Sequence, residues 1–136
     1  MATLRSMCVF RNLLLSCTLI SACGGAAPEM TSQVRSDLGA FTVDVVSDPS
    51  PPLRGANRVL YTITDASGAK VDGLALDVVP WMPAHGHGTS VAPTVQARGL
   101  GVYQIDQVVF FMPGEWELRT TFVASGDHVT PSFEIP

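Results

Sequence analysis

Apolar and polar residues alternate at a period of two along most of the chain after about residue 40. The alternation is clearest at 115–123, where Trp116, Leu118, Thr120 and Phe122 alternate with Glu115, Glu117, Arg119 and Thr121. Successive side chains of a β-strand point to opposite faces, so such a pattern places one row in a core and the other in solvent. Because no window of helical period interrupts the pattern, we expect an all-β domain.

Turn-forming residues divide this region into seven expected strands. Asp48-Pro49-Ser50-Pro51-Pro52 and Asp65-Ala66-Ser67-Gly68 are typical of strand ends and turns. The expected strands are 40–47, 58–64, 74–79, 91–97, 102–111, 115–123 and 128–135. Pro93 makes the fourth an edge strand, and the alternation near Asp106 leaves a bulge open. The number and spacing of these strands predict an immunoglobulin-like antiparallel β-sandwich.

The first 22 residues are expected to be an export signal. Arg5 and Arg11 precede an apolar run over 13–22. This run is too short to span a hydrocarbon layer of ~30 Å. The run ends in Ile20-Ser21-Ala22-Cys23-Gly24, which resembles the lipobox of bacterial lipoproteins, where the cysteine is acylated and becomes the new N-terminus. We therefore expect lipidation at Cys23. The alternative is an ordinary cleaved signal in which Cys23 has no role.

The expected domain organisation follows from this assignment. Residues 1–22 form the lipoprotein signal peptide, 23–39 a lipidated flexible linker of small and polar residues, and 40–136 the sandwich. The protein would be anchored to a bacterial membrane without spanning it, in the cell envelope, with its domain facing the periplasm or the exterior. Gly24, in place of Asp, after the cysteine resembles the outer-membrane-sorted lipoproteins of enteric bacteria, which favours the outer membrane.

The charge of the chain limits the classes of partner, and its cysteine content limits the possible disulfides. Cleavage would leave six basic against twelve acidic residues, so nucleic acid and anionic lipid are poor partners. Cys23 would be the only cysteine left and would carry the lipid, so no intramolecular disulfide is expected. A partner protein in the envelope stays open.

The stretch 81–89 is the candidate functional site because it holds two of the three histidines and reads as neither strand nor helix. His85 and His87 are two residues apart, so their imidazoles can project to one side of an extended chain. Met82 lies in the same stretch, and Met112 lies in a second aromatic-Met-Pro motif. Thioethers favour Cu(I) and imidazole also accepts other metals, so copper matches these four residues best.

Strand polarity predicts where this site lies. If successive strands alternate in direction, the 81–89 loop and the turn at 112–114 share one end of the sandwich. His128 and the tethered start of the first strand fall at the other end. The candidate site is therefore expected to face away from the membrane.

Each of these residues also has a plainer interpretation. Met82 and Met112 each sit between an aromatic residue and a proline, where a methionine can close the mouth of a core instead of binding a metal. The His-Gly-His-Gly run can be a solvated loop without a ligand. No Gly-x-Ser-x-Gly elbow or nucleotide-binding motif is present, so we expect no enzymatic activity.

The two motifs together resemble the YtkA-like domain family of exported bacterial proteins, which is related in pattern to FixH-type proteins. The residues that carry the resemblance are Met82-Pro83-Ala84-His85-Gly86-His87-Gly88, Pro93, Gly101-Val102-Tyr103 and the run from Phe111 to Leu118. The resemblance spans about Phe41 to Ile135. It implies a sandwich fold, an envelope location and a link to copper handling or oxidase maturation.

Two hypotheses follow for the function. In the first, a lipid-anchored module binds copper or another soft metal through His85, His87, Met82 and Met112. In the second, a non-catalytic interaction or structural module uses the same loop to dock a partner protein, with no metal. The sequence departs from periplasmic copper carriers because it has no Met-rich repeat and no histidine at the mature N-terminus. This departure counts against copper transport but leaves copper binding open.

Overall fold

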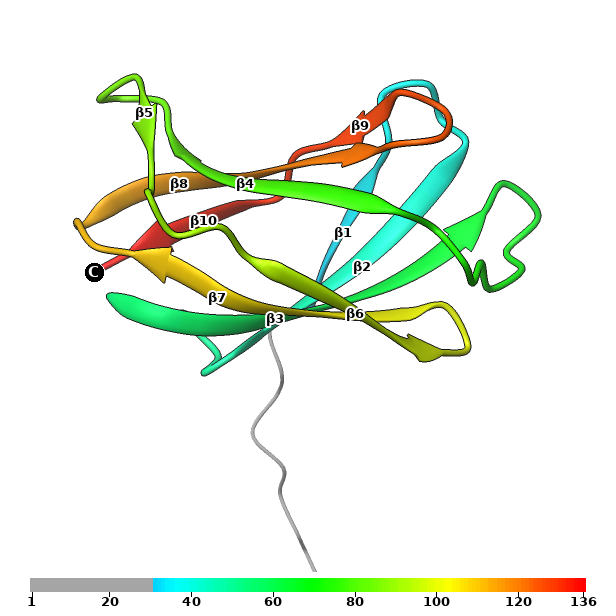
Figure 1. The fold of residues 1–136 in the computed structure, drawn as a ribbon, viewed down its shortest axis with the longest axis horizontal. Coiled ribbons are helices and arrows are strands. Elements are labelled where there is room, and N and C mark those ends of the chain that lie inside the picture. The colour runs from blue at the N-terminus through cyan, green and yellow to red at the C-terminus, as the bar shows by residue number, and fades with distance from the viewer. Residues whose placement is uncertain (1–30) are drawn as a thin grey trace, which may run out of the picture.

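The computed structural model describes residues 31–136, which form two packed antiparallel sheets and contain no helix (Figure 1). The strands are β1 (Thr31–Arg35), β2 (Phe41–Asp48), β3 (Gly55–Asp65), β4 (Leu76–Met82), β5 (His87–Gly88), β6 (Thr94–Gly99), β7 (Val102–Phe110), β8 (Gly114–Phe122), β9 (Asp127–Val129) and β10 (Ser132–Ile135). The predicted all-β sandwich is confirmed.

The first sheet has the strand order β1-β2-β3-β7-β6, and the second has the order β10-β8-β4-β5, with β9 also paired to β8. One face of each sheet contributes to a shared core. Its largest buried side chains include Tyr61 and Tyr103 from the first sheet and Trp116 and Phe122 from the second. The hydroxyl groups of Tyr61 and Thr120 lie 3.0 Å apart within this core, which places β3 against β8. The alternation predicted for β8 is therefore the alternation that builds the core.

Two details of the first sheet also agree with the sequence. β6 begins directly after Pro93 and forms an edge of the sheet, as expected for a strand interrupted by proline. A register shift between Asn57 and Val59 of β3 accompanies a left-handed Gln107 in β7, with φ of 61°. The bulge left open near Asp106 is therefore present, and it allows both Ile105 and Val108 to be buried.

The second half of the expected flexible linker is instead a strand. β1 pairs with β2 over Thr31↔Val46 to Arg35↔Thr42. The alternation did not reveal this strand because Val34 is the one apolar residue in Thr31-Ser32-Gln33-Val34-Arg35. An edge strand needs few apolar side chains, since its pairing is decided by the free edge of its neighbour. The sandwich therefore begins before residue 40.

The strand expected at 128–135 is divided in two. β9 pairs with the end of β8 and β10 with its beginning, while Pro131 lies between them. The carbonyl of Pro131 still accepts a hydrogen bond of 2.8 Å from the Leu118 amide, so the register continues across the gap. Proline interrupts the strand because it has no N–H to donate.

Buried Asp127 ties two turns together at the end of the sandwich where β9 lies. Its Oδ1 accepts hydrogen bonds of 2.8 Å from the backbone amides of Leu38 and His128, and the residue is 0% exposed. Burial acts to raise the pKa of this carboxyl, but hydrogen bonds from Ser36 and from backbone amides outweigh it. The pKa of Asp127 therefore lies below its ordinary value.

Several predictions concern residues outside 31–136. The signal peptide, the lipid attachment at Cys23 and the first part of the linker lie outside the described residues. Within the described part of the chain, no helix is long and apolar enough to cross a membrane.

Candidate functional site

The candidate loop is a tight hairpin between β4 and β5. The amides of His85 and Gly86 both donate to the carbonyl of Met82, at 3.2 and 3.0 Å. Beyond this turn, β5 pairs back onto β4 through Met82↔His87 and Trp81↔Gly88. The stretch 81–89, which was expected to be neither strand nor helix, therefore contains the end of β4 and all of β5.

Pro80 does not end β4, although the strand was expected to stop at residue 79, directly before this proline. Because the Leu118 amide donates to β10, the pair Pro80↔Leu118 between β4 and β8 is of the non-hydrogen-bonded kind. The nitrogen of Pro80 therefore faces away from β8, so its missing N–H costs no bond between these two strands. The strand continues for two residues, which carries Met82 into the core.

Two glycines shape the hairpin for different reasons. Gly86 has φ of 68°, a left-handed conformation that side chains with a Cβ disfavour. A Cβ on Gly88 would lie 2.6 Å from the carbonyl oxygen of Pro80, so this position requires close backbone approach. Together they allow the chain to reverse between His85 and His87 and return along β4.

The two histidines of the loop lie side by side and are both exposed. Their ring centroids are 5.7 Å apart at an interplanar angle of 61°. Nδ1 of His87 lies 3.2 Å from the carbonyl oxygen of Gly88, which leaves Nε2 free of that contact. The two imidazoles are therefore neighbours, and their convergence on one ion stays a prediction.

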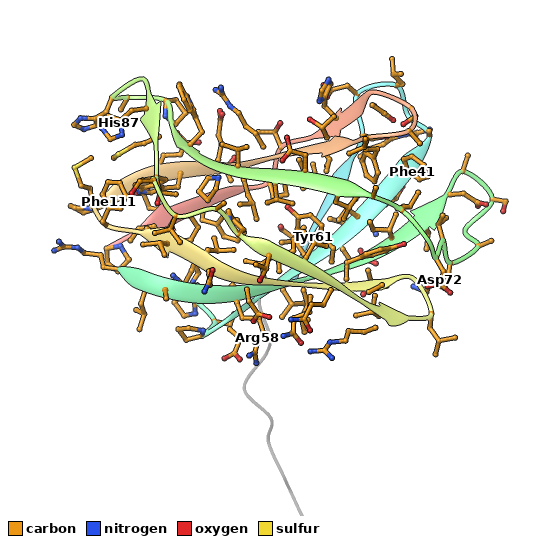
Figure 2. The ribbon with its side chains drawn as sticks, viewed as in Figure 1. Phe41, Arg58, Tyr61, Asp72, His87 and Phe111 are labelled. Atoms are coloured by element: carbon orange, nitrogen blue, oxygen red, sulfur yellow. The ribbon has the colours of Figure 1, made fainter. Side chains whose placement is uncertain are left out.

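The turn between β7 and β8 lies beside this hairpin, as strand polarity predicted. The Phe111 ring stacks on the His87 ring with an interplanar angle of 10° and centroids 6.4 Å apart. Figure 2 shows both side chains at one end of the sandwich. The indole Nε1 of Trp116 donates to the carbonyl of Met112 at 3.0 Å, and the Arg54 guanidinium donates to the carbonyl of Phe111 at 3.1 Å. These bonds anchor the turn.

Phe111 is a site residue that the sequence analysis did not single out. Its side chain is 40% exposed although it is a large aromatic. Its edge packs on the buried Trp116, with centroids 5.4 Å apart. The sequence carried one signal for it, because two consecutive phenylalanines in an alternating strand cannot both face the core.

The two methionines are placed differently. Met82 is 3% exposed and belongs to the hydrophobic core, and its Cε lies 3.0 Å from where a Cβ on Gly114 would be. Met82 was expected to support a metal, whereas in the structure it closes the core, because β4 extends to it with its side chain inward. Met112 is half-buried at the turn and packs against the core.

His128 lies at the other end of the molecule, as expected. It is exposed on β9, where its Nδ1 lies 3.1 Å from the Thr121 hydroxyl. Figure 1 shows β9 and β5 at opposite ends of the sandwich. His128 is therefore separate from the loop histidines.

The chain does not enter the sandwich where the sequence analysis placed it. β2 runs toward the loop end, where Arg54 contacts Phe111, and β1 runs antiparallel to β2. Thr31 pairs with Val46, which pairs with Leu60, so β1 begins level with the middle of β3. The expected entry at residue 40, at the end opposite the loop, is therefore replaced by entry through β1. Which end of the domain faces a membrane stays a prediction.

Other metal-binding chemistry is sparse in the described residues. No group of three or more histidine, cysteine, aspartate or glutamate side chains among them could hold a metal ion. Nearby Trp81 stacks against a cation instead, with the guanidinium carbon of Arg119 4.6 Å from its ring centroid. The loop end thus offers two imidazoles, with Met112 in the adjacent turn.

Comparison with known proteins assigns the chain to a family. A search of curated proteins and a search of solved structures found no significant match. The sequence model described as YtkA-like matches residues 36–121, which is more than half of the chain. The matched region includes the His85–His87 hairpin and the Phe111–Met112 turn and ends within β8. The chain therefore belongs to the YtkA-like family.

Proposed function

We propose that this protein binds one soft metal ion, copper before others, at the hairpin between β4 and β5. His85 and His87 supply imidazole nitrogens, and Met112 supplies a thioether. The single observation that carries the proposal is the separation of 5.7 Å between the two imidazole centroids.

This separation suits a shared ion. A metal bonded to ring nitrogens at about 2 Å lies about 3.2 Å from each ring centroid, so two rings on one ion can be at most about 6.4 Å apart. The observed 5.7 Å falls inside this limit and corresponds to a wide nitrogen–metal–nitrogen angle. Rotation of two exposed side chains is all that is needed to aim both nitrogens at one point.

The donor set favours Cu(I). Zinc sites use four ligands in a tetrahedral arrangement, and Cu(II) prefers four or more nitrogen and oxygen ligands. The described residues hold no cluster of three or more histidine, cysteine or carboxylate ligands to meet that demand. Two imidazoles and one thioether suit an ion that accepts low coordination numbers and soft ligands.

The surroundings of His87 support its role as a ligand. The contact between Nδ1 and the Gly88 carbonyl is the kind that fixes the tautomer of a metal-binding histidine and leaves Nε2 for the ion. The Phe111 ring covers one face of this imidazole. It would keep water from one side of a bound ion.

We further propose that the protein is a lipoprotein anchored through Cys23 in the cell envelope. Cys23 is eight residues before Thr31, so an extended linker spans at most about 29 Å. Since β1 begins level with the middle of β3, this short reach would hold the domain close to the membrane surface. Replacing Cys23 with serine should release the protein from membranes, and a lipid-sized mass increment should disappear from its N-terminal peptide.

We propose a role in binding and not in catalysis, because the sequence holds no Gly-x-Ser-x-Gly elbow and no nucleotide-binding motif. The loop is also open to solvent. We therefore expect copper delivery or sequestration.

The test is competition for Cu(I) against a chromophoric chelator with the purified protein. The double variant His85→Ala/His87→Ala should lose affinity by about a hundredfold or more, because removal of ligands exceeds the effect of their supporting contacts. His128→Ala is the matched control and should bind as the unaltered protein does. Binding that survives the double substitution would refute the assignment, and no binding at all would favour an interaction module without metal.

A further inference from the structure

We propose that the free edge of β10 is a docking site for an extended segment of another protein, which would add a strand to the second sheet. This site lies apart from the metal loop, because β10 and β5 are opposite edges of that sheet. β10 also lies outside the region matched by the family. The proposal therefore does not depend on metal binding.

The backbone of β10 presents unused hydrogen-bonding groups. In an antiparallel pair, residues alternate between those that bond to the neighbour and those that point away from it. Because the Pro131 carbonyl accepts from Leu118, the bonded positions are Pro131, Phe133 and Ile135. The N–H and C=O groups of Ser132 and Glu134 thus point away from β8. No other strand of residues 31–136 pairs with this edge.

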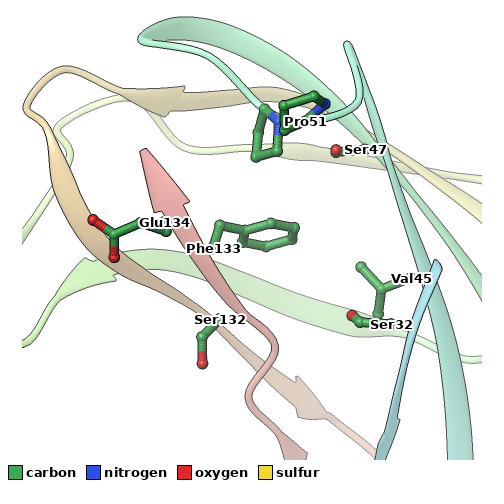
Figure 3. Close-up of a pocket in the computed structure, with 8 residues that line it drawn as sticks. Ser32, Val45, Ser47, Pro51, Ser132, Phe133 and Glu134 are labelled. Carbon is green, nitrogen blue, oxygen red and sulfur yellow. The ribbon is translucent and has the colours of Figure 1, made fainter. Parts of the chain in front are cut away.

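A cavity of about 210 Å³ lies beside that edge, between β10 and the strands β1 and β2 of the other sheet. Its walls are mainly apolar and include Val45, Pro51, Pro52 and Phe133, with Ser32 and Ser47 nearby. Figure 3 shows the Phe133 ring in this space, extended toward the side where Val45 and Ser32 lie. A cavity of about 150 Å³ is enough for benzene, so this one can take a phenyl or branched aliphatic side chain.

The cavity lies where an added strand would place a side chain. Cross-strand neighbours point to the same face of a sheet, so the residue of an incoming strand opposite Phe133 would point inward. The first sheet continues to β1, whereas the second sheet stops at β10. An added strand would extend the shorter sheet beneath β1 and fill the cavity with one apolar side chain.

Charge identifies the flanking residues of the partner. Glu134 lies directly opposite Glu115 on the outer face of the second sheet, and like charges in such a pair are destabilising. The cations of the described chain that form salt bridges pair with Asp48, Asp106 and Glu117, not with these two glutamates. A lysine or arginine opposite Glu134 would relieve the repulsion. The expected partner segment therefore alternates basic and large apolar residues.

The test uses the purified protein and a fluorescent peptide of sequence Lys-Phe-Lys-Val-Lys. The same sequence with glutamate in place of lysine is the charge control, and Lys-Phe-Lys-Val-Lys with N-methylated backbone amides is the pairing control. Only the unmodified basic peptide should bind, and it should slow hydrogen exchange at the amides of Ser132 and Glu134. Glu134→Lys, an exposed substitution, should weaken that binding by about tenfold and favour the acidic peptide.

A second variant keeps the test independent of charge. Ser132→Pro removes an N–H that points away from β8, so the native ladder is retained while the docking edge is blocked. It should abolish binding with the thermal unfolding midpoint unchanged within a few degrees. No binding of the basic peptide, or binding that leaves both amides unprotected and survives Glu134→Lys, would overturn the proposal.

Discussion

Truncation of Met82 measures how much this side chain contributes to the free energy of unfolding. The side chain is 3% exposed, and its Cε fills the space above Gly114. Met82→Ala would lose the burial of a thioether chain and leave a cavity between β4 and β8. Such changes cost 2–5 kcal/mol, and we expect about 3 kcal/mol because the flanking backbone is paired on both sides. For a domain of this size the unfolding midpoint should fall by roughly 10 °C or more.

The assay is reversible chemical denaturation of the variant and the unaltered protein, with unchanged dependence on denaturant as the check for two-state behaviour. Met82→Leu is the matched control, because a substitution that conserves volume should cost less than about 1.5 kcal/mol. Met82→Leu should also keep its affinity for Cu(I), whereas Met112→Leu should lose part of it. A cost below about 1 kcal/mol for Met82→Ala, or loss of copper binding in Met82→Leu, would refute the core assignment.

Three further perturbations test other parts of the molecule. Asp127→Asn should destabilise the protein by about 2 kcal/mol at neutral pH, because a charged acceptor of two amide hydrogen bonds is lost. Because the pKa of Asp127 is lowered in the folded state, the carboxylate stabilises the protein fully above its unfolded-state pKa and loses this effect as the pH falls through its folded-state pKa. The free energy of unfolding of Asp127→Asn should therefore depend less on pH in that acidic range. Leu100 is 80% exposed with φ of 55°, so Leu100→Gly should raise stability by about 0.5–1 kcal/mol in the same assay, and an unchanged or lower value would contradict the strain. Gly88→Ala should displace β5 from Pro80 and weaken Cu(I) binding, which chelator competition would detect; equal affinity would mean that the paired hairpin is not needed for binding.

Much of the fold could be predicted from the sequence because several strands have a recognisable pattern in their own residues. The alternation in β8 and the proline before β6 identify the core face and an edge without knowledge of the neighbours. β1 and β5 could not be found this way. β1 is mostly polar, and β5 is two residues long, so both exist because a neighbouring strand offers free backbone groups.

The sequence likewise predicts some features of the candidate site and not others. The spacing of His85 and His87 predicted that they are neighbours, but the structure brings them together through a turn at Gly86 and not along an extended chain. The approach of the Phe111–Met112 turn follows from strand polarity. The role of Met82 depends on how far β4 extends, which in turn depends on the orientation of Pro80 within the ladder. The direction of entry depends on β1. The extent of β4 and the direction of chain entry are both set by pairing with neighbouring strands, so the local sequence does not predict them.

Nuclear magnetic resonance of the histidine side chains during Cu(I) titration can show directly whether His85 and His87 share one metal ion. The protein has three histidines, so each can be assigned and followed separately. We expect the ring signals of His85 and His87 to change together and to saturate at one equivalent of Cu(I), while those of His128 stay in place. Saturating changes at His128, or at only one of the loop histidines, would contradict a shared metal at the hairpin.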